Sequence, residues 1–128
     1  MLFRSILMIT SSNGTRWIVP KGSIERGSDA SRCAVQEAYE EAGVRGKLSS
    51  REPFGTVRLK RRRRRIDVAV FLLKVSEVHQ RWPERDRRKR AWLTPEQAAA
   101  AVEDLGLRDL ITELADQPDH YARVRGRS

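Results

Sequence analysis

The stretch WIVPKGSIERGSDASRCAVQEAYEEAGV, from Trp17 to Val44, decides the fold because it places an apolar strand end, a tight turn and a helix in succession. The Pro-Lys-Gly sequence at 20–22 ends the strand, since proline lacks a backbone N–H and glycine permits the bend. Ser28 or Asp29 is a suitable N-cap, and Gly43 is a suitable residue to close the helix. The stretch therefore predicts a loop followed by one helix.

Three glutamates of this helix, Glu37, Glu40 and Glu41, are spaced at i, i+3 and i+4 and so share one face. Like charges at this spacing repel by about 0.2–0.5 kcal/mol per pair, which a bound cation would offset. Carboxylates, together with a carbonyl of the turn before Gly22, are the hard oxygen ligands that Mg²⁺ or Mn²⁺ prefers. A solvated acidic helix face is the alternative interpretation of the same spacing.

The rest of the chain alternates apolar segments with turn residues and has no internal repeat. The predicted strands are Leu2–Thr10, Arg16–Val19, one or two within Leu48–Leu59, Ile66–Val78 and Ala91–Leu93. The first helix is predicted to end at about Ala42. A second helix is predicted to be capped by Thr94, with Pro95 at its first position, and a third is predicted over Leu107–Ala115. This order indicates an α+β class, in an α/β/α sandwich with a mixed β-sheet.

Composition narrows the class of protein further. The chain has 128 residues, which suits one domain, predicted at 1–116, followed by a polar basic tail at 117–128. The apolar run Val68–Leu73 is far too short to span a membrane, and the lone Cys33 cannot form an internal disulfide. We therefore expect a cytoplasmic protein without a membrane partner. Its net charge of +9 attracts polyanions.

Residues 22–44 resemble the Nudix box, whose pattern is G-x5-E-x7-R-E-U-x-E-E-x-G-U, with U an aliphatic residue. The matching positions are Gly22, Glu37, Ala38, Glu40, Glu41, Gly43 and Val44. Two positions differ, because Ser28 replaces the first Glu of the box and Gln36 replaces its Arg. These two family side chains typically form a structural salt bridge, so their joint loss leaves no orphan charge and keeps the acidic face intact.

The resemblance implies a Nudix fold and a hydrolase that cleaves a diphosphate bond. It implies that Glu37 and Glu41 bind Mg²⁺, or Mn²⁺, together with the carbonyl of Lys21. It further implies that Glu40 orients or deprotonates the attacking water, although Glu37 and Glu40 could exchange these roles. Segments outside the box resemble the subgroup of diphosphoinositol polyphosphate and diadenosine polyphosphate hydrolases.

Two basic segments, RLKRRRRR at 58–65 and RDRRKR at 85–90, are candidates for binding phosphate groups. In the family, the first corresponds to a hairpin loop that contacts phosphates, and Ser-Ser at 11–12 begins a stretch that is Ser-Ser-Arg in relatives. The predicted substrate-binding residues are Ser11, Ser12, Lys60, Arg61, Arg62, Arg88 and Arg90, with Arg108 as a further candidate. Solvated loops are the alternative interpretation of both segments.

The sequence therefore predicts a Mg²⁺-dependent hydrolase of a polyanionic phosphorylated small molecule, as a monomer or homodimer. The competing hypothesis is a catalytically weak Nudix-like module that binds RNA or nucleotides. The altered Ser28 and Gln36 positions and the arginine run favour that hypothesis. The three glutamates favour catalysis, because a binding module has no need of them.

Overall fold

A computed structural model describes residues 5–11, 13–20, 29–61 and 64–116 of the protein, and for residues 59–61 and 64–66 it describes the backbone alone. The predicted loop at 23–28, the start of the first strand and the tail at 117–128 lie outside these ranges. The strands are β1 Ile6–Thr10, β2 Trp17–Ile18, β3 Val44–Leu48, β4 Gly55–Arg61, β5 Arg64–Val70, β6 Leu73–Val78 and β7 Arg90–Leu93. The helices are α1 Ala30–Ala42, α2 Pro95–Ala101 and α3 Leu105–Ala115.

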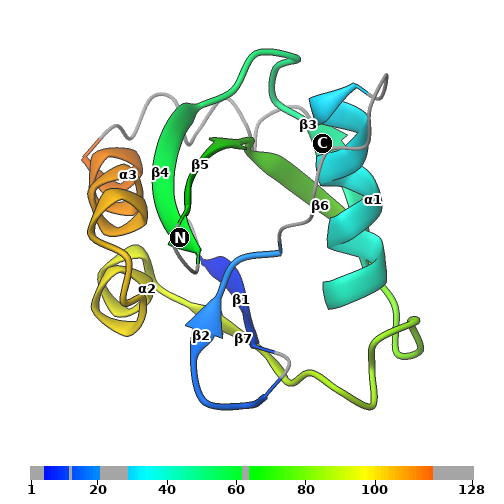
Figure 1. Cartoon of the computed structure of the whole chain (residues 1–128). Coiled ribbons are helices and arrows are strands. Elements are labelled where there is room, and N and C mark those ends of the chain that lie inside the picture. Colours follow the sequence, from blue (N-terminus) through cyan, green and yellow to red (C-terminus); the bar gives the residue numbers. More distant parts are fainter. Residues whose placement is uncertain (1–4, 12, 21–28, 62–63, 117–128) are drawn as a thin grey trace.

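Strand β1 lies at the centre of the fold and is apolar on both faces. Ile6 and Met8 pack in a core with α2 and α3, whereas Leu7 and Ile9 pack in a second core with α1 and β3. Side chains alternate between the faces of a strand, so a continuous apolar sequence such as ILMIT must be covered on both sides. Figure 1 shows the result, with strands between α1 on one side and α2 and α3 on the other.

The strands pair in three groups, ordered β2-β1-β7, β3-β6 and β4-β5. Every pair that the described residues form is antiparallel. The α+β class and the helix-covered strands are as predicted. The expected mixed sheet is not seen among these pairs. The pairs β1–β2 and β4–β5 join consecutive strands, whereas β1–β7 and β3–β6 join strands that are distant in sequence, and both kinds are antiparallel.

Two of the strand predictions were wrong. The predicted strand Ile66–Val78 is two strands, β5 and β6, joined at Phe71–Leu72 and paired with different partners. The break falls inside an apolar run that has no Gly or Pro to mark it. The predicted strands within Leu48–Leu59 begin too late, because β3 starts at Val44 and β4 starts at Gly55.

Gly46 explains why β3 was missed. It lies where β3 meets β6 in an irregular register, and a Cβ there would approach the Lys74 carbonyl oxygen to within van der Waals overlap. Glycine is depleted in regular strands, but it is required where two backbones approach this closely. The sequence signal for a strand was therefore weakened at the position that permits the pairing.

The helix ends follow the sequence closely. The Asp29 side chain caps α1 by accepting from the Ser31 N–H, and Gly43 ends it with φ 69°. Thr94 and Gln97 form a capping box at α2, with Pro95 at its start. Helix α3 begins before the predicted Leu107, because the Asp104 side chain accepts from the Leu107 N–H. No helix in the described ranges is long and apolar enough to cross a membrane.

Candidate active site

The end of α1 meets the end of β1 and the segment Trp82–Arg90, and their polar groups form the candidate site. The Glu84 N–H donates to the Glu40 carbonyl at 3.0 Å. Thr10 and Lys89 are joined by two hydrogen bonds. The Thr10 N–H donates to the Lys89 carbonyl at 2.9 Å, and the Lys89 N–H donates to the side-chain Oγ1 of Thr10 at 2.9 Å. Three parts of the chain that are distant in sequence are thus joined here.

Trp82 and Arg90 fasten the segment to the last turn of α1. Trp82 Nε1 donates to the Glu41 carbonyl at 3.1 Å, and Arg90 Nη1 donates to the Ala42 carbonyl at 2.8 Å. The Arg90 guanidinium also lies 4.1 Å from the centre of the Trp82 ring. The last carbonyls of a helix lack partners within the helix, so these donors satisfy them.

Glu41 is the buried carboxylate of the site, with 3% of its side chain exposed. Burial raises its pKa to about 8, and a hydrogen bond with Glu37 and the charges of Glu37 and Glu84 act in the same direction. Arg88 opposes the shift, because its Nη2 lies 3.2 Å from Glu41 Oε1. Glu37 and Glu41 therefore form a carboxylate pair, in which a proton or a cation must offset the repulsion.

Glu40 is held separately from that pair. Its Oε1 accepts a hydrogen bond of 2.6 Å from Gln36 Nε2, one turn earlier on α1. Gln36 is the residue that stands at the arginine position of the box, so a neutral amide orients Glu40 here. Its carboxylate is half-buried, whereas Gln36 is exposed.

The donor set of the carboxylate pair fits a hard divalent cation. Two adjacent carboxylates offer the oxygen ligands that Mg²⁺ takes, usually with several waters retained. The third predicted ligand, the carbonyl of Lys21, lies outside the described residues. Within the described part of the chain, no three His, Cys, Asp or Glu side chains group as ligands, so Glu37, Glu40 and Glu41 do not converge as a set of three.

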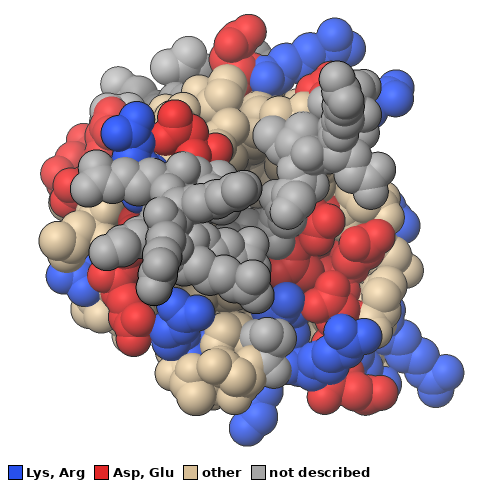
Figure 2. Space-filling model, in the orientation of Figure 1, with Lys and Arg blue, Asp and Glu red and all other residues tan. Residues whose placement is uncertain are grey.

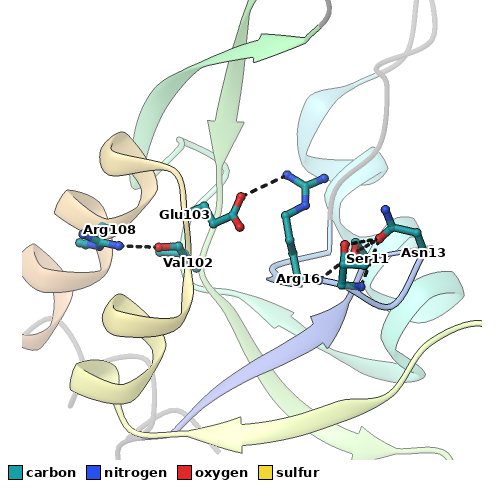
Figure 3. A network of polar contacts seen from close by, with 7 residues as sticks. Ser11, Asn13, Arg16, Val102, Glu103 and Arg108 are labelled. Atoms are coloured by element: carbon teal, nitrogen blue, oxygen red, sulfur yellow. Dashed lines mark hydrogen bonds and ion pairs between the residues drawn. The ribbon is translucent and has the colours of Figure 1, made fainter.

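Of the predicted substrate-binding residues, Arg88 and Arg90 lie at this site, and both contact protein groups. The further candidate, Arg108, lies elsewhere and donates to the carbonyls of Ala99 and Val102 at 2.9 and 2.8 Å, where α2 ends. Figure 3 shows its Val102 contact beside the ion pair of Arg16 and Glu103.

Ser11 is buried at the end of β1 and organises the turn that follows. Its hydroxyl donates to Asn13 Oδ1 at 2.6 Å and accepts from the Arg16 N–H at 3.2 Å (Figure 3). Ser12 and Arg62 lie outside the described residues, and for Lys60 and Arg61 only the backbone of β4 is described. In that hairpin Lys60 pairs with Arg65 and Arg61 with Arg64, so the basic residues follow both strands toward its turn.

Sequence reasoning missed Glu84 and Thr10, which contact Arg88. No spacing pattern connects Thr10 to Arg88, because the two come together only when β1 and β7 pair. Glu84 lies four residues before Arg88, and that i,i+4 spacing was the available sequence signal. Figure 2 shows the resulting charge distribution on one face, where acidic side chains gather over α1 and basic side chains border them. An acidic site ringed by cations can hold a metal ion and attract an anionic compound.

This fold and site agree with one protein family. The chain belongs to the Nudix family, because the NUDIX domain model matches residues 3–114. It is similar to Nudix hydrolase 4 of Arabidopsis thaliana, with 32% identity over 83% of this chain and 51% of that protein. It is also similar to diphosphoinositol polyphosphate phosphohydrolase 3-alpha of Mus musculus, with 36% identity over 77% of this chain and 60% of that protein.

A solved structure supports the fold alone. The solution structure of the E. coli ORF135 protein matches with a TM-score of 0.69 and 17% identity, over 90% of this chain and 82% of that one. The chain spans between half and two thirds of the length of the two curated relatives. Family membership is therefore established, and the predicted subgroup resemblance is confirmed by the second relative.

Proposed function

We propose that this protein is a Mg²⁺-dependent hydrolase that cleaves a diphosphate bond in a highly phosphorylated small molecule. The observation that carries the proposal is the contact between two carboxylates of α1, those of half-buried Glu37 and buried Glu41, beside Arg88. Burying an acid in contact with a second one costs stability unless a counter-charge is present. A family whose members are named hydrolases supports a catalytic use of that pair.

Glu37 and Glu41, with the Lys21 carbonyl, would hold the cation. When bound, Mg²⁺ would neutralise charge on the phosphate oxygens as a Lewis acid. The protein's own contribution is to hold the two carboxylates together in a fixed position, with Glu41 out of water. The cation would supply the positive charge that favours their ionised form. The burial of Glu41 strengthens the electrostatic interactions of its carboxylate, because the local dielectric constant is lower than that of water.

Glu40 is our candidate for the base that orients or deprotonates the attacking water. The hydrogen bond from Gln36 fixes its carboxylate without supplying a positive charge. Glu37 is the alternative base, with Glu40 then contributing to the cation site.

The substrate class follows from charge. The net charge of +9 and the basic strands of the β4–β5 hairpin favour a compound with many phosphate groups over a sugar nucleotide. A relative is named as a diphosphoinositol polyphosphate phosphohydrolase, and we infer a substrate of that class or a dinucleoside polyphosphate. We also infer a cytoplasmic location, from the lone Cys33.

The test is a panel of dinucleoside polyphosphates, diphosphoinositol phosphates and nucleoside diphosphate derivatives, assayed with Mg²⁺ and with Mn²⁺. We expect metal-dependent cleavage, seen as two phosphorylated products or, from a terminal diphosphate, as free phosphate. Glu40→Gln should slow it by about 10²–10⁴-fold, and Glu41→Gln should remove it. Glu52→Gln is the matched control, because Glu52 is an exposed loop residue. No metal-dependent turnover of any compound would contradict the proposal, and RNA affinity unchanged in Glu41→Gln would favour the binding module.

A further inference from the structure

The three kinds of nitrogen in the Arg88 guanidinium all contact the protein itself. Nη2 lies 3.2 Å from Glu41 Oε1, Nε donates to Glu84 Oε1 at 2.8 Å, and Nη1 donates to the Thr10 carbonyl at 2.9 Å. Only 11% of the side chain is exposed. A guanidinium has five N–H groups in a fixed planar fork, so these contacts set the orientation of the whole group.

Arg88 is itself held on both sides. Its own N–H donates to the Glu84 carbonyl at 3.1 Å, and the next residue, Lys89, is bonded to Thr10 through its N–H and its carbonyl. Glu84 in turn donates its N–H to the Glu40 carbonyl of α1. The guanidinium therefore connects a strand end, a helix and a turn that are each fixed by backbone contacts.

Glu41 needs such a partner more than a surface carboxylate would. It is almost fully buried and lies near the negative charges of Glu37 and Glu84. Gln36 stands where the Nudix box has an arginine. Its amide donates a hydrogen bond to Glu40 and carries no charge. The positive charge beside Glu41 comes instead from Arg88, which lies outside the box.

We propose that Arg88 is a positioning residue that fixes the Glu41 carboxylate for cation binding, and that it does not serve mainly to clamp the substrate. The contact occupies Oε1 of Glu41 and so determines which way the carboxylate faces. This inference rests on the proposed function, because it assigns Glu41 to the cation site. Groups that orient metal ligands in this way commonly change metal affinity 10–100-fold when removed.

The experiment measures Mn²⁺ binding to the substrate-free protein by electron paramagnetic resonance, with kcat and KM measured on the best compound of the panel. The decisive variant is Arg88→Lys, which keeps the charge but cannot make the three fork contacts. We expect the Mn²⁺ affinity of this variant to fall about tenfold. Its kcat should be lower at subsaturating Mn²⁺ and should recover at high Mn²⁺, and its KM for the substrate should not change. Arg87→Lys is the matched control, because Arg87 is exposed on the same turn.

A raised KM with unchanged Mn²⁺ affinity in Arg88→Lys would overturn the inference and make Arg88 a substrate clamp. Arg88→Gln is the second variant if Arg88→Lys does not fold. Its Mn²⁺ affinity also falls if positioning dominates, whereas a higher affinity would show that Arg88 mainly repels the cation and would overturn the inference. Wild-type protein that binds no Mn²⁺ would overturn the proposed function, and the inference with it.

Discussion

Gly43 offers a sharp test of how the segment Trp82–Arg90 is fastened to α1. Its φ of 69° lies in the left-handed region, and a Cβ added there would lie 2.7 Å from Cδ2 of the Trp82 ring. That ring cannot move freely, because its Nε1 donates to the Glu41 carbonyl and the Arg90 guanidinium lies over it. Replacing Gly43 by alanine should therefore disturb the candidate site as well as the helix end.

The magnitude has two parts. The left-handed conformation costs a non-glycine residue about 1–2 kcal/mol, and forcing an extra methyl group against a packed ring costs about 1–3 kcal/mol more. Gly43→Ala should thus lower the free energy of unfolding by about 2–5 kcal/mol. Gly14 is the matched control, because its φ is 74° and nothing lies within 4 Å of the added Cβ. Gly14→Ala should cost only the first part.

The assay is urea unfolding of both variants, alone and combined with Trp82→Ala. The entropy that alanine removes from the unfolded chain is similar at both positions, so it cancels in the comparison. We expect Gly43→Ala to cost about 1–3 kcal/mol more than Gly14→Ala, and this excess should vanish in the Trp82→Ala background. Equal costs for the two glycines, or an excess that persists without Trp82, would refute the assigned contact.

Three further predictions address the helices. Arg108→Met should lower the free energy of unfolding, measured in urea, by about 1–3 kcal/mol, because Arg108 donates to the carbonyls that end α2. KM should not change, and a raised KM would instead indicate that Arg108 binds substrate. Asp104→Ala should lower the free energy of unfolding by about 1 kcal/mol, because the N-cap of α3 is lost. The control Asp109→Ala, at an exposed residue, should lower it by less than about 0.5 kcal/mol, and equal effects would contradict the cap. Hydrogen bonds from Ser31 lower the pKa of Asp29 from 3.8, so its stabilisation is present above that pKa. The stability gap between wild type and Asp29→Ala should therefore narrow as the pH falls below about 4, and a gap that widens would reverse the assigned sign.

The sequence predicted those parts of the fold that depend on local chemistry. Asp29, Thr94 and Gly43 define helix ends through short-range hydrogen bonds or a required backbone angle, so a short stretch of sequence is enough to identify them. The division of 66–78 into two strands depends on which strands each half pairs with, and that is a property of the whole domain. The pairing of β3 was obscured by Gly46 for the same reason.

The candidate site divides in a similar way. The spacing of Glu37, Glu40 and Glu41 was visible because residues on one helix face recur at fixed intervals. The contacts of Arg88 were not visible, because a basic run in a loop is typical of a solvated surface as much as of a buried ion pair. Glu84 lies four residues before Arg88, a local spacing, whereas the contact with Glu41 depends on the tertiary arrangement.

The double-sided burial of β1 has a consequence for how the molecule responds to ligands. The same strand supplies Met8 to the core under α2 and α3 and Ile9 to the core under α1. Neither helical layer can therefore separate from β1 without disturbing the strand on which the other core depends. The amides of these two residues should exchange with deuterium only through global opening. A cation that binds on the α1 side should consequently slow exchange of the Met8 amide as strongly as that of Ile9, so occupancy of the site is detectable at a residue of the opposite core.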